Sequence, residues 1–162
     1  MAGYQGDSGQ GDDDADGGAM DQALRSAARM YADDQAAKAL GISIDEVAPG
    51  RATVRMRVTG DMINGHRIAH GGYIFLLADT AFAYACNSYG PVTVAQGCQI
   101  TFLRPAAEGD ELTAAAAEGA RMERSGIYDV TVSRADGQVV AEFRGHSRTM
   151  PQRDRAGSGS SA

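Results

Sequence analysis

The sequence contains no tryptophan, only two cysteines and no long hydrophobic run. The cysteines, Cys86 and Cys98, follow no metal-binding spacing, so we expect two reduced thiols and no metal site. The most apolar segment, residues 73–86, is shorter than the ~18 residues of a membrane span and is interrupted by Asp79. The N-terminus is acidic, unlike a signal peptide. These absences predict a cytoplasmic protein without a membrane partner.

The negative charge of the chain is confined largely to its beginning. Of the formal net charge of −6, residues 1–20 contribute −5 and residues 151–162 contribute +1, which leaves −2 for residues 21–150. A nearly neutral body gives no basic surface for nucleic acid. The two ends are rich in Gly, Ser and Asp, a composition typical of segments that bury little apolar surface. We therefore predict a disordered acidic tail over 1–20, one domain over 21–150 and a flexible tail over 151–162.

The order of helix and strand patterns within the body predicts an α+β fold. Apolar residues recur at helical spacing over 21–40, where Gly41 provides a stop. Residues 72–88 are apolar on every side, which is typical of an enclosed helix. Alternating patterns predict strands over 42–48, 51–58, 92–105, 110–123, 126–134 and 139–150, with turn signals at Pro49-Gly50 and Asp136-Gly137. A long antiparallel sheet would have one face available to cover the apolar helix.

Asp79 lies in the middle of this apolar helix, where aspartate is an unfavourable choice. An unpaired carboxylate in an apolar environment costs several kcal/mol or remains protonated. A structural explanation is a hydrogen bond to the carboxylate from Thr80, Thr101 or a neighbouring strand, which would fix the register. A catalytic explanation is that the carboxylate acts as a base.

The stretch His70-Gly71-Gly72 lies where a loop becomes the apolar helix. Free N–H groups at a helix start carry partial positive charge and can stabilise an oxyanion, and glycine allows a ligand to approach the backbone. His66 and His70 have the spacing of metal ligands on a helix, but the glycines indicate a loop and no third ligand is near. With Asn64 upstream and Asp79 downstream, the stretch favours hydrolysis: a carboxylate activates water while backbone N–H groups stabilise a tetrahedral intermediate.

Helix geometry separates the two parts of this candidate site. Asp79 follows Gly71 by eight residues, or ~12 Å at ~1.5 Å per residue. One carbonyl carbon cannot contact both groups of one helix at that distance. If the two groups cooperate, they come from different chains, as a two-fold symmetric dimer would allow.

At these residues the sequence resembles a known family, the hotdog-fold acyl-CoA thioesterases of the phenylacetic acid degradation type. The resemblance is carried by "GHRIAHGGYIFLLADTAFAYACNSYG", "FLRPA", "GIYDVTV" and "FRGHSRT", and it extends from about Leu24 to Met150. It implies a long antiparallel sheet wrapped around one central helix, in a homodimer that pairs again into a homotetramer. It also implies roles for four residues: Gly71 N–H polarises the thioester carbonyl, Asp79 of the partner chain is base or nucleophile, Asn64 positions water, and His70 supports the turn.

The resemblance further implies a substrate. It predicts hydrolysis of an aryl-acetyl-CoA, of the phenylacetyl or hydroxyphenylacetyl type, to the free acid and coenzyme A. No separate cofactor is needed, because coenzyme A is part of the substrate. Contacts to the coenzyme are expected from Arg104, Arg121, Arg124 and His146. Relatives often carry Ser or Thr on the strand facing the aspartate, where this sequence offers Gln96 and Gly97. The alternatives are a medium-chain acyl-CoA thioesterase and a non-catalytic acyl-CoA-binding module.

Overall fold

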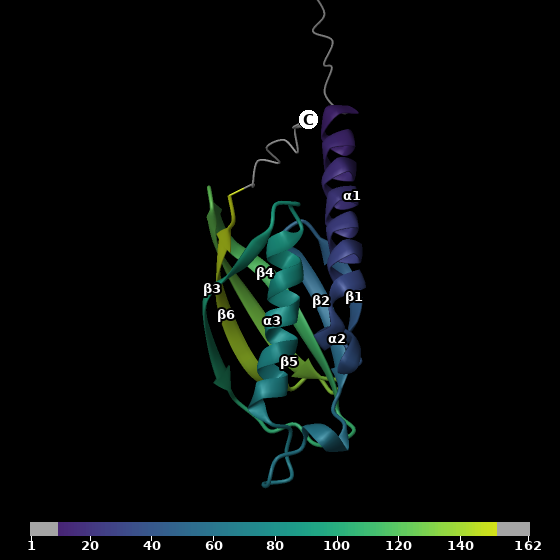
Figure 1. Cartoon of the computed structure of the whole chain (residues 1–162), viewed down its shortest axis with the longest axis vertical. Helices are drawn as coiled ribbons and strands as arrows, with labels where there is room; N and C mark the ends of the chain where they lie inside the picture. Colours follow the sequence, from purple (N-terminus) through teal and green to yellow (C-terminus); the bar gives the residue numbers. More distant parts are fainter. Residues whose placement is uncertain (1–9, 152–162) are drawn as a thin grey trace, which may run out of the picture.

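The computed structural model describes residues 10–151, and of residues 10–15 only the backbone. The chain forms two N-terminal helices, a strand hairpin, a short 3-10 turn, a central helix and four further strands (Figure 1). The elements are α1 (Gln10–Asp33), α2 (Gln35–Ala39), β1 (Ser43–Ala48), β2 (Arg51–Arg57), η1 (Gly60–Met62), α3 (Gly71–Asn87), β3 (Thr93–Phe102), β4 (Glu111–Met122), β5 (Ser125–Arg134) and β6 (Val139–Thr149).

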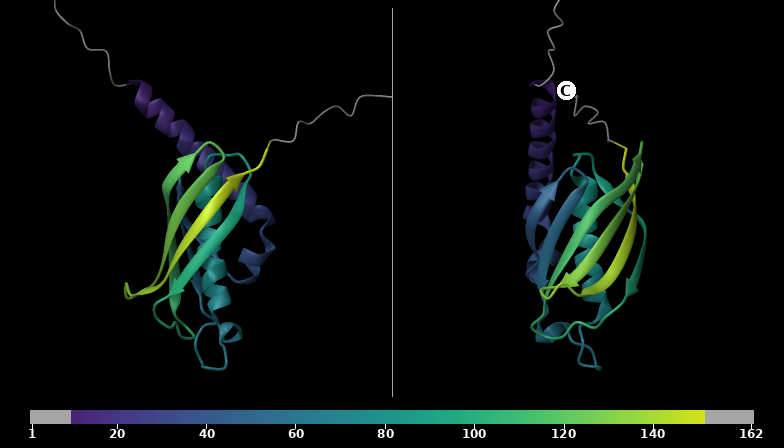
Figure 2. Two further views of the ribbon diagram at one scale, coloured as in Figure 1. Left: turned by 90° about the vertical axis from the view of Figure 1, so that its left-hand side faces the viewer. Right: turned by 180° about the vertical axis from the view of Figure 1, so that it is seen from behind.

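The strands form one six-stranded sheet in the order β1-β2-β4-β5-β6-β3, and every neighbouring pair is antiparallel. The sheet curves around α3, as the views from two further sides show (Figure 2). Strand β3 follows α3 in the chain yet lies at the far edge beside β6, which leaves its outer edge without a neighbour in the described residues. The predicted α+β architecture, with a sheet wrapped around the apolar helix, is confirmed.

Alternation along the strands explains why the sheet covers α3 on one face. Every second residue is buried in β2, in the first half of β4 and over most of β5, and these positions carry mostly Val, Ala, Leu and Met. Alanine favours helix over strand, yet the alanine-rich segment forms β4 as its alternation predicts. Between β2 and β5 its small side chains, such as buried Ala114 and Ala116, let α3 approach the sheet closely. No helix in residues 10–151 is long and apolar enough to cross a membrane.

The N-terminal helices differ from the expectation in two respects. The predicted helix 21–40 is interrupted at Asp34, whose Oδ1 accepts a hydrogen bond from Ala37 N at 2.8 Å and caps α2. In the other direction α1 begins at Gln10, so the tail predicted as disordered over 1–20 is helical in its described part. A helix anchored by buried Ala23 and Ala27 extends by adding one hydrogen bond per residue, and it projects beyond the sheet (Figure 1). Residues 1–9 and 152–162 lie outside the described part.

Candidate active site

The start of α3 leaves one backbone donor free. His70 is the N-cap of the helix, and its Nδ1 accepts a hydrogen bond from Gly72 N at 3.0 Å. Tyr73 N donates to His70 O at 3.0 Å. Within residues 10–151 the N–H of Gly71, which directly precedes these two paired groups, has no acceptor. The helix therefore presents the N–H of Gly71, at its positive end, to a ligand.

Asn64 lies beside this donor because it closes a tight loop before the helix. Its Oδ1 accepts from His66 N at 2.9 Å and from Ile68 N at 3.4 Å. The loop is narrow enough that Arg67 adopts a positive φ of 61°, which is unusual for a residue with a side chain. With Oδ1 engaged by the loop, the Nδ2 amide of Asn64 remains as a donor.

An open cavity of about 440 Å³ brings these groups together. Its lining residues are Asn64, Ile68, Ala69, Gly71, Ile74, Phe102, Leu103, Arg104 and Pro105. The ring of Phe102, which is 49% exposed, lies against the backbone of Gly71. A Cβ placed on Gly71 would lie only 2.9 Å from Phe102 Cζ, so a side chain there would have to displace the ring. This close approach favours glycine at position 71, where the backbone does not have a positive φ.

Asp79 lies further along α3, half-buried and without a partner. Within the described part of the chain, no hydrogen bond reaches its carboxylate, and burial alone raises its pKa above that of an ordinary aspartate. The hydroxyl of Thr80 donates to Leu76 O at 2.7 Å instead. The structural explanation considered from the sequence, a hydrogen bond that fixes Asp79, therefore finds no support. A half-buried carboxylate with a raised pKa is a frequent feature of catalytic sites.

The residue that faces Asp79 from the edge strand is Cys98. A bulge between Ala95 and Gly97 shifts the register of β3, so that Cys98 pairs with Gly145. Gly145 packs against the ring of Phe82, one turn after Asp79, which places Cys98 on the face of the sheet toward α3. Burial, and secondly the charge of Asp79, raises the pKa of the Cys98 thiol. The family resemblance pointed to Gln96 and Gly97 for this position, and the bulge brings Cys98 there instead.

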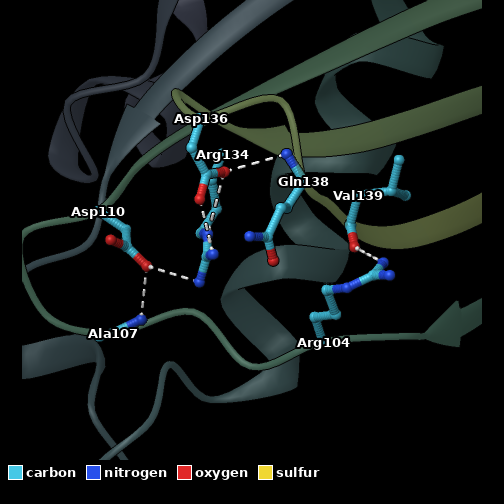
Figure 3. A network of polar contacts seen from close by, with 7 residues as sticks. All are labelled: Arg104, Ala107, Asp110, Arg134, Asp136, Gln138 and Val139. Atoms are coloured by element: carbon cyan, nitrogen blue, oxygen red, sulfur yellow. Dashed lines mark hydrogen bonds and ion pairs between the residues drawn. The ribbon is translucent and has the colours of Figure 1, made fainter.

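The four predicted coenzyme contacts lie at two different ends of the sheet. Arg104 lines the cavity beside Gly71, and its Nη1 donates to Val139 O at 3.0 Å (Figure 3). The adjoining ion pair between Arg134 and Asp136, at 2.8 Å, belongs to the network that anchors the loop after β3 (Figure 3).

The other three residues lie at the opposite end. Arg121 forms an ion pair with Glu118 at 3.4 Å, and Arg124 donates twice to Thr149 O at 3.1 Å. His146 lines a separate cavity of about 500 Å³, together with Gln96 and Gly97. Residues 10–151 contain no cluster of side chains suited to a metal ion.

Comparison with known proteins agrees with this geometry. The family model described as "Thioesterase superfamily" matches residues 66–141. The acyl-coenzyme A thioesterase PaaI of Escherichia coli (strain K12) is 49% identical over 129 residues, which cover 80% of this chain and 92% of the relative. The structure of the E. coli PaaI protein from the phenylacetic acid degradation operon superposes with a TM-score of 0.80 at 47% identity, covering 82% of this chain and 96% of that one.

A second solved structure, the TT0310 protein of Thermus thermophilus, is 38% identical with a TM-score of 0.70, covering 72% of this chain and 98% of that one. The chain belongs to the thioesterase superfamily and has its hotdog fold. It is accordingly a thioester hydrolase, which excludes the non-catalytic alternative.

Proposed function

We propose that the protein hydrolyses aryl-acetyl-CoA thioesters, with Gly71 of one chain and Asp79 of a second chain acting on the same carbonyl. The observation that carries this proposal is the pairing of a free N–H at the start of α3 with an unpartnered, half-buried carboxylate on the same helix. The substrate class is supported by the similarity to PaaI, whose E. coli representative comes from a phenylacetic acid degradation operon.

In the proposed reaction the thioester oxygen accepts a hydrogen bond from Gly71 N–H. The positive end of α3 then stabilises the negative charge that develops on this oxygen when the carbonyl carbon becomes tetrahedral. Asp79 removes a proton from the attacking water, and its raised pKa makes it a stronger base than an exposed aspartate. The free Nδ2 of Asn64, which lines the same cavity as Gly71, orients the bound groups. Collapse of the intermediate breaks the C–S bond, and the coenzyme A thiolate takes the proton that Asp79 received from water, which restores the carboxylate.

The second chain is provided by pairing of β3 with its copy. β3 is an edge strand of ten residues that is exposed along most of its length, with Val94 at 44% and Phe102 at 49%. Such a long edge without proline or lysine is suited to pairing. In an antiparallel pair centred near Ile100, Phe102 lies opposite the partner's Cys98. Because Phe102 contacts Gly71 and Cys98 faces Asp79 within each chain, this pairing brings Gly71 close to the partner's Asp79. The homotetramer remains a prediction.

This pairing also accounts for the separation of the basic residues. Arg104 at one end of β3 would lie near the opposite end of the partner's β3, where the partner's Arg121, Arg124 and His146 are found. The phosphates of coenzyme A would then be bound from both chains.

A panel of acyl-CoA thioesters tests the function by release of free thiol. We expect the highest kcat/KM for phenylacetyl-CoA and hydroxyphenylacetyl-CoA, and lower values for octanoyl-CoA and acetyl-CoA. A preference for octanoyl-CoA would favour the medium-chain alternative, and a lack of turnover on all four would refute the proposed reaction.

Subunit mixing tests the shared site. Asn64→Ala and Asp79→Asn each inactivate both sites of their own dimer, but a mixed dimer has one site without either change. Refolding equal amounts together makes about half of the dimers mixed, so about a quarter of the sites recover. If mixed dimers are confirmed by mass and show no more activity than the separately refolded variants, Gly71 and Asp79 do not act across chains.

A further inference from the structure

The aromatic side chain in contact with Gly71 offers an explanation for acyl-group selectivity. We infer that Phe102 is a specificity-determining residue, whose ring forms the wall against which the aryl part of the substrate binds. This inference rests on the proposed function, because it concerns the acyl group whose carbonyl Gly71 receives.

The contact between Phe102 and Gly71 fixes the place of the ring. A Cβ on Gly71 would lie 2.9, 3.3 and 3.4 Å from three atoms of the ring, so the ring lies in van der Waals contact with the glycine itself. A carbonyl oxygen that accepts a hydrogen bond from Gly71 N–H lies about 3 Å from that nitrogen. The atoms bonded to the carbonyl carbon are then within reach of the ring, whichever substrate is bound.

The distribution of polarity in the cavity decides which arm of the thioester lies there. Its inner wall is apolar, formed by Phe102 with the buried Ile74 and Ala69. Ile74 follows Gly71 by three residues and so lies on the same face of α3. Arg104 provides positive charge elsewhere in the lining. The pantetheine arm of coenzyme A carries amides and leads to the phosphates, which suit the polar part, whereas a phenyl group suits the apolar wall.

Phe102 can contact a bound ring because it lines the cavity beside Gly71. Its position on β3 opposite buried Ala141 turns it toward α3. Aromatic pairs prefer edge-to-face or offset stacking, and their interaction exceeds that of area burial by an amount equivalent to about 2- to 12-fold in binding. The same side chain thus limits residue 71 to glycine and favours a flat acyl group beside it.

The experiment compares two substrates that differ only in aromaticity, phenylacetyl-CoA and cyclohexylacetyl-CoA. We expect Phe102→Leu to lower the ratio of their kcat/KM values about 3- to 10-fold relative to wild type. Phe102→Tyr, which keeps the ring, should retain the wild-type ratio. Phe75→Leu is the matched control, since Phe75 packs on Phe143 at 5.5 Å between ring centroids and lines none of the cavities described above. It should leave the ratio unchanged.

An unchanged ratio in Phe102→Leu, with both substrates still hydrolysed, would overturn the inference and leave the proposed function intact. Loss of the dimer by size-exclusion chromatography with an unchanged ratio would assign Phe102 to subunit pairing instead and would equally overturn it. If the wild type hydrolyses neither thioester, the proposed function fails and the inference fails with it. Should Phe102→Leu not fold, Phe102→Met provides the same comparison with an unbranched side chain that is not aromatic.

Discussion

The two ends of α3 are built in opposite ways. At the C-terminal end Asn87 and Ser88 satisfy the last turn: Asn87 Nδ2 donates to Ala83 O at 2.9 Å and to Thr93 O at 2.8 Å, and Ser88 Oγ donates to Ala85 O at 2.7 Å. Ser88 Oγ also accepts from Gly50 N at 2.8 Å, which ties the β1-β2 turn to the helix. At the N-terminal end a single cap from His70 leaves Gly71 N–H free above an open cavity.

This difference separates stability from function along one helix. The closed end is reinforced by Tyr128, whose hydroxyl donates to Glu118 at 2.8 Å, and by Arg121, which stacks on Tyr89 at 3.8 Å. Burial raises the pKa of Tyr128, with the carboxylate of Glu118 as a second cause, so that its hydroxyl stays protonated as a donor. The polar side chains of the last turn, Asn87 and Ser88, are thus paired, whereas Gly71 N–H is left free beside the cavity.

The largest expected effect is on Asp79. Asp79→Asn should lower kcat at least ~10²-fold, because the amide keeps the packing but cannot accept the proton of water. The carboxyl has a raised pKa in the folded protein, so its contribution to stability is greatest when it is protonated and is lost as the pH rises through that pKa. The variant should therefore melt at a higher temperature than wild type at pH 7, and the difference should shrink as the pH falls toward 4. Wild-type turnover, or a lower melting temperature at pH 7, would show that the carboxylate is structural.

The second effect compares one substitution at both ends. Asn87→Ala leaves Thr93 N and O unpaired in a buried site and should cost about 1–3 kcal/mol, or roughly 2–10 °C in Tm, with little change in kcat of the folded enzyme. Asn64→Ala should do the reverse. It should lower kcat strongly and lower Tm by less than half of the decrease expected for Asn87→Ala. Thermal denaturation and initial rates on both variants measure this, and equal effects on Tm would contradict the division between the two ends.

The third effect concerns the ring that covers the free donor. Gly71→Ala keeps the N–H but places a methyl group against Phe102, and the overpacking should lower kcat about tenfold. Phe102→Ala removes the obstacle. Adding Gly71→Ala to the Phe102→Ala variant should therefore lower kcat less than adding it to the wild type. A double-mutant cycle on kcat gives the coupling. Additive effects would show that the requirement for glycine has another cause.

The smallest effect is expected outside both ends. Removal of residues 1–20 should leave kcat and Tm within experimental error, because the first buried side chain described in α1 is Ala23. A change of several degrees in Tm would show that this segment stabilises the domain.

Local patterns in the sequence identified the helices and strands and the residues of the candidate active site. Period-two alternation located the six strands, and the apolar run with Asp79 in its middle identified both the enclosed helix and the unusual carboxylate. His70-Gly71-Gly72 at the helix start was readable because capping and glycine are local features of the chain. The approximate separation of Gly71 and Asp79 followed from helix rise alone.

What these residues face depends on how distant parts of the chain pack together. The bulge in β3 brought Cys98 rather than Gln96 or Gly97 to the level of Asp79, and the fold placed Phe102 against Gly71 from a strand 31 residues later. Arg104 was separated from the other predicted coenzyme contacts for the same reason. Register, bulges and contacts between distant segments depend on how whole surfaces pack, and no local pattern in the chain records them.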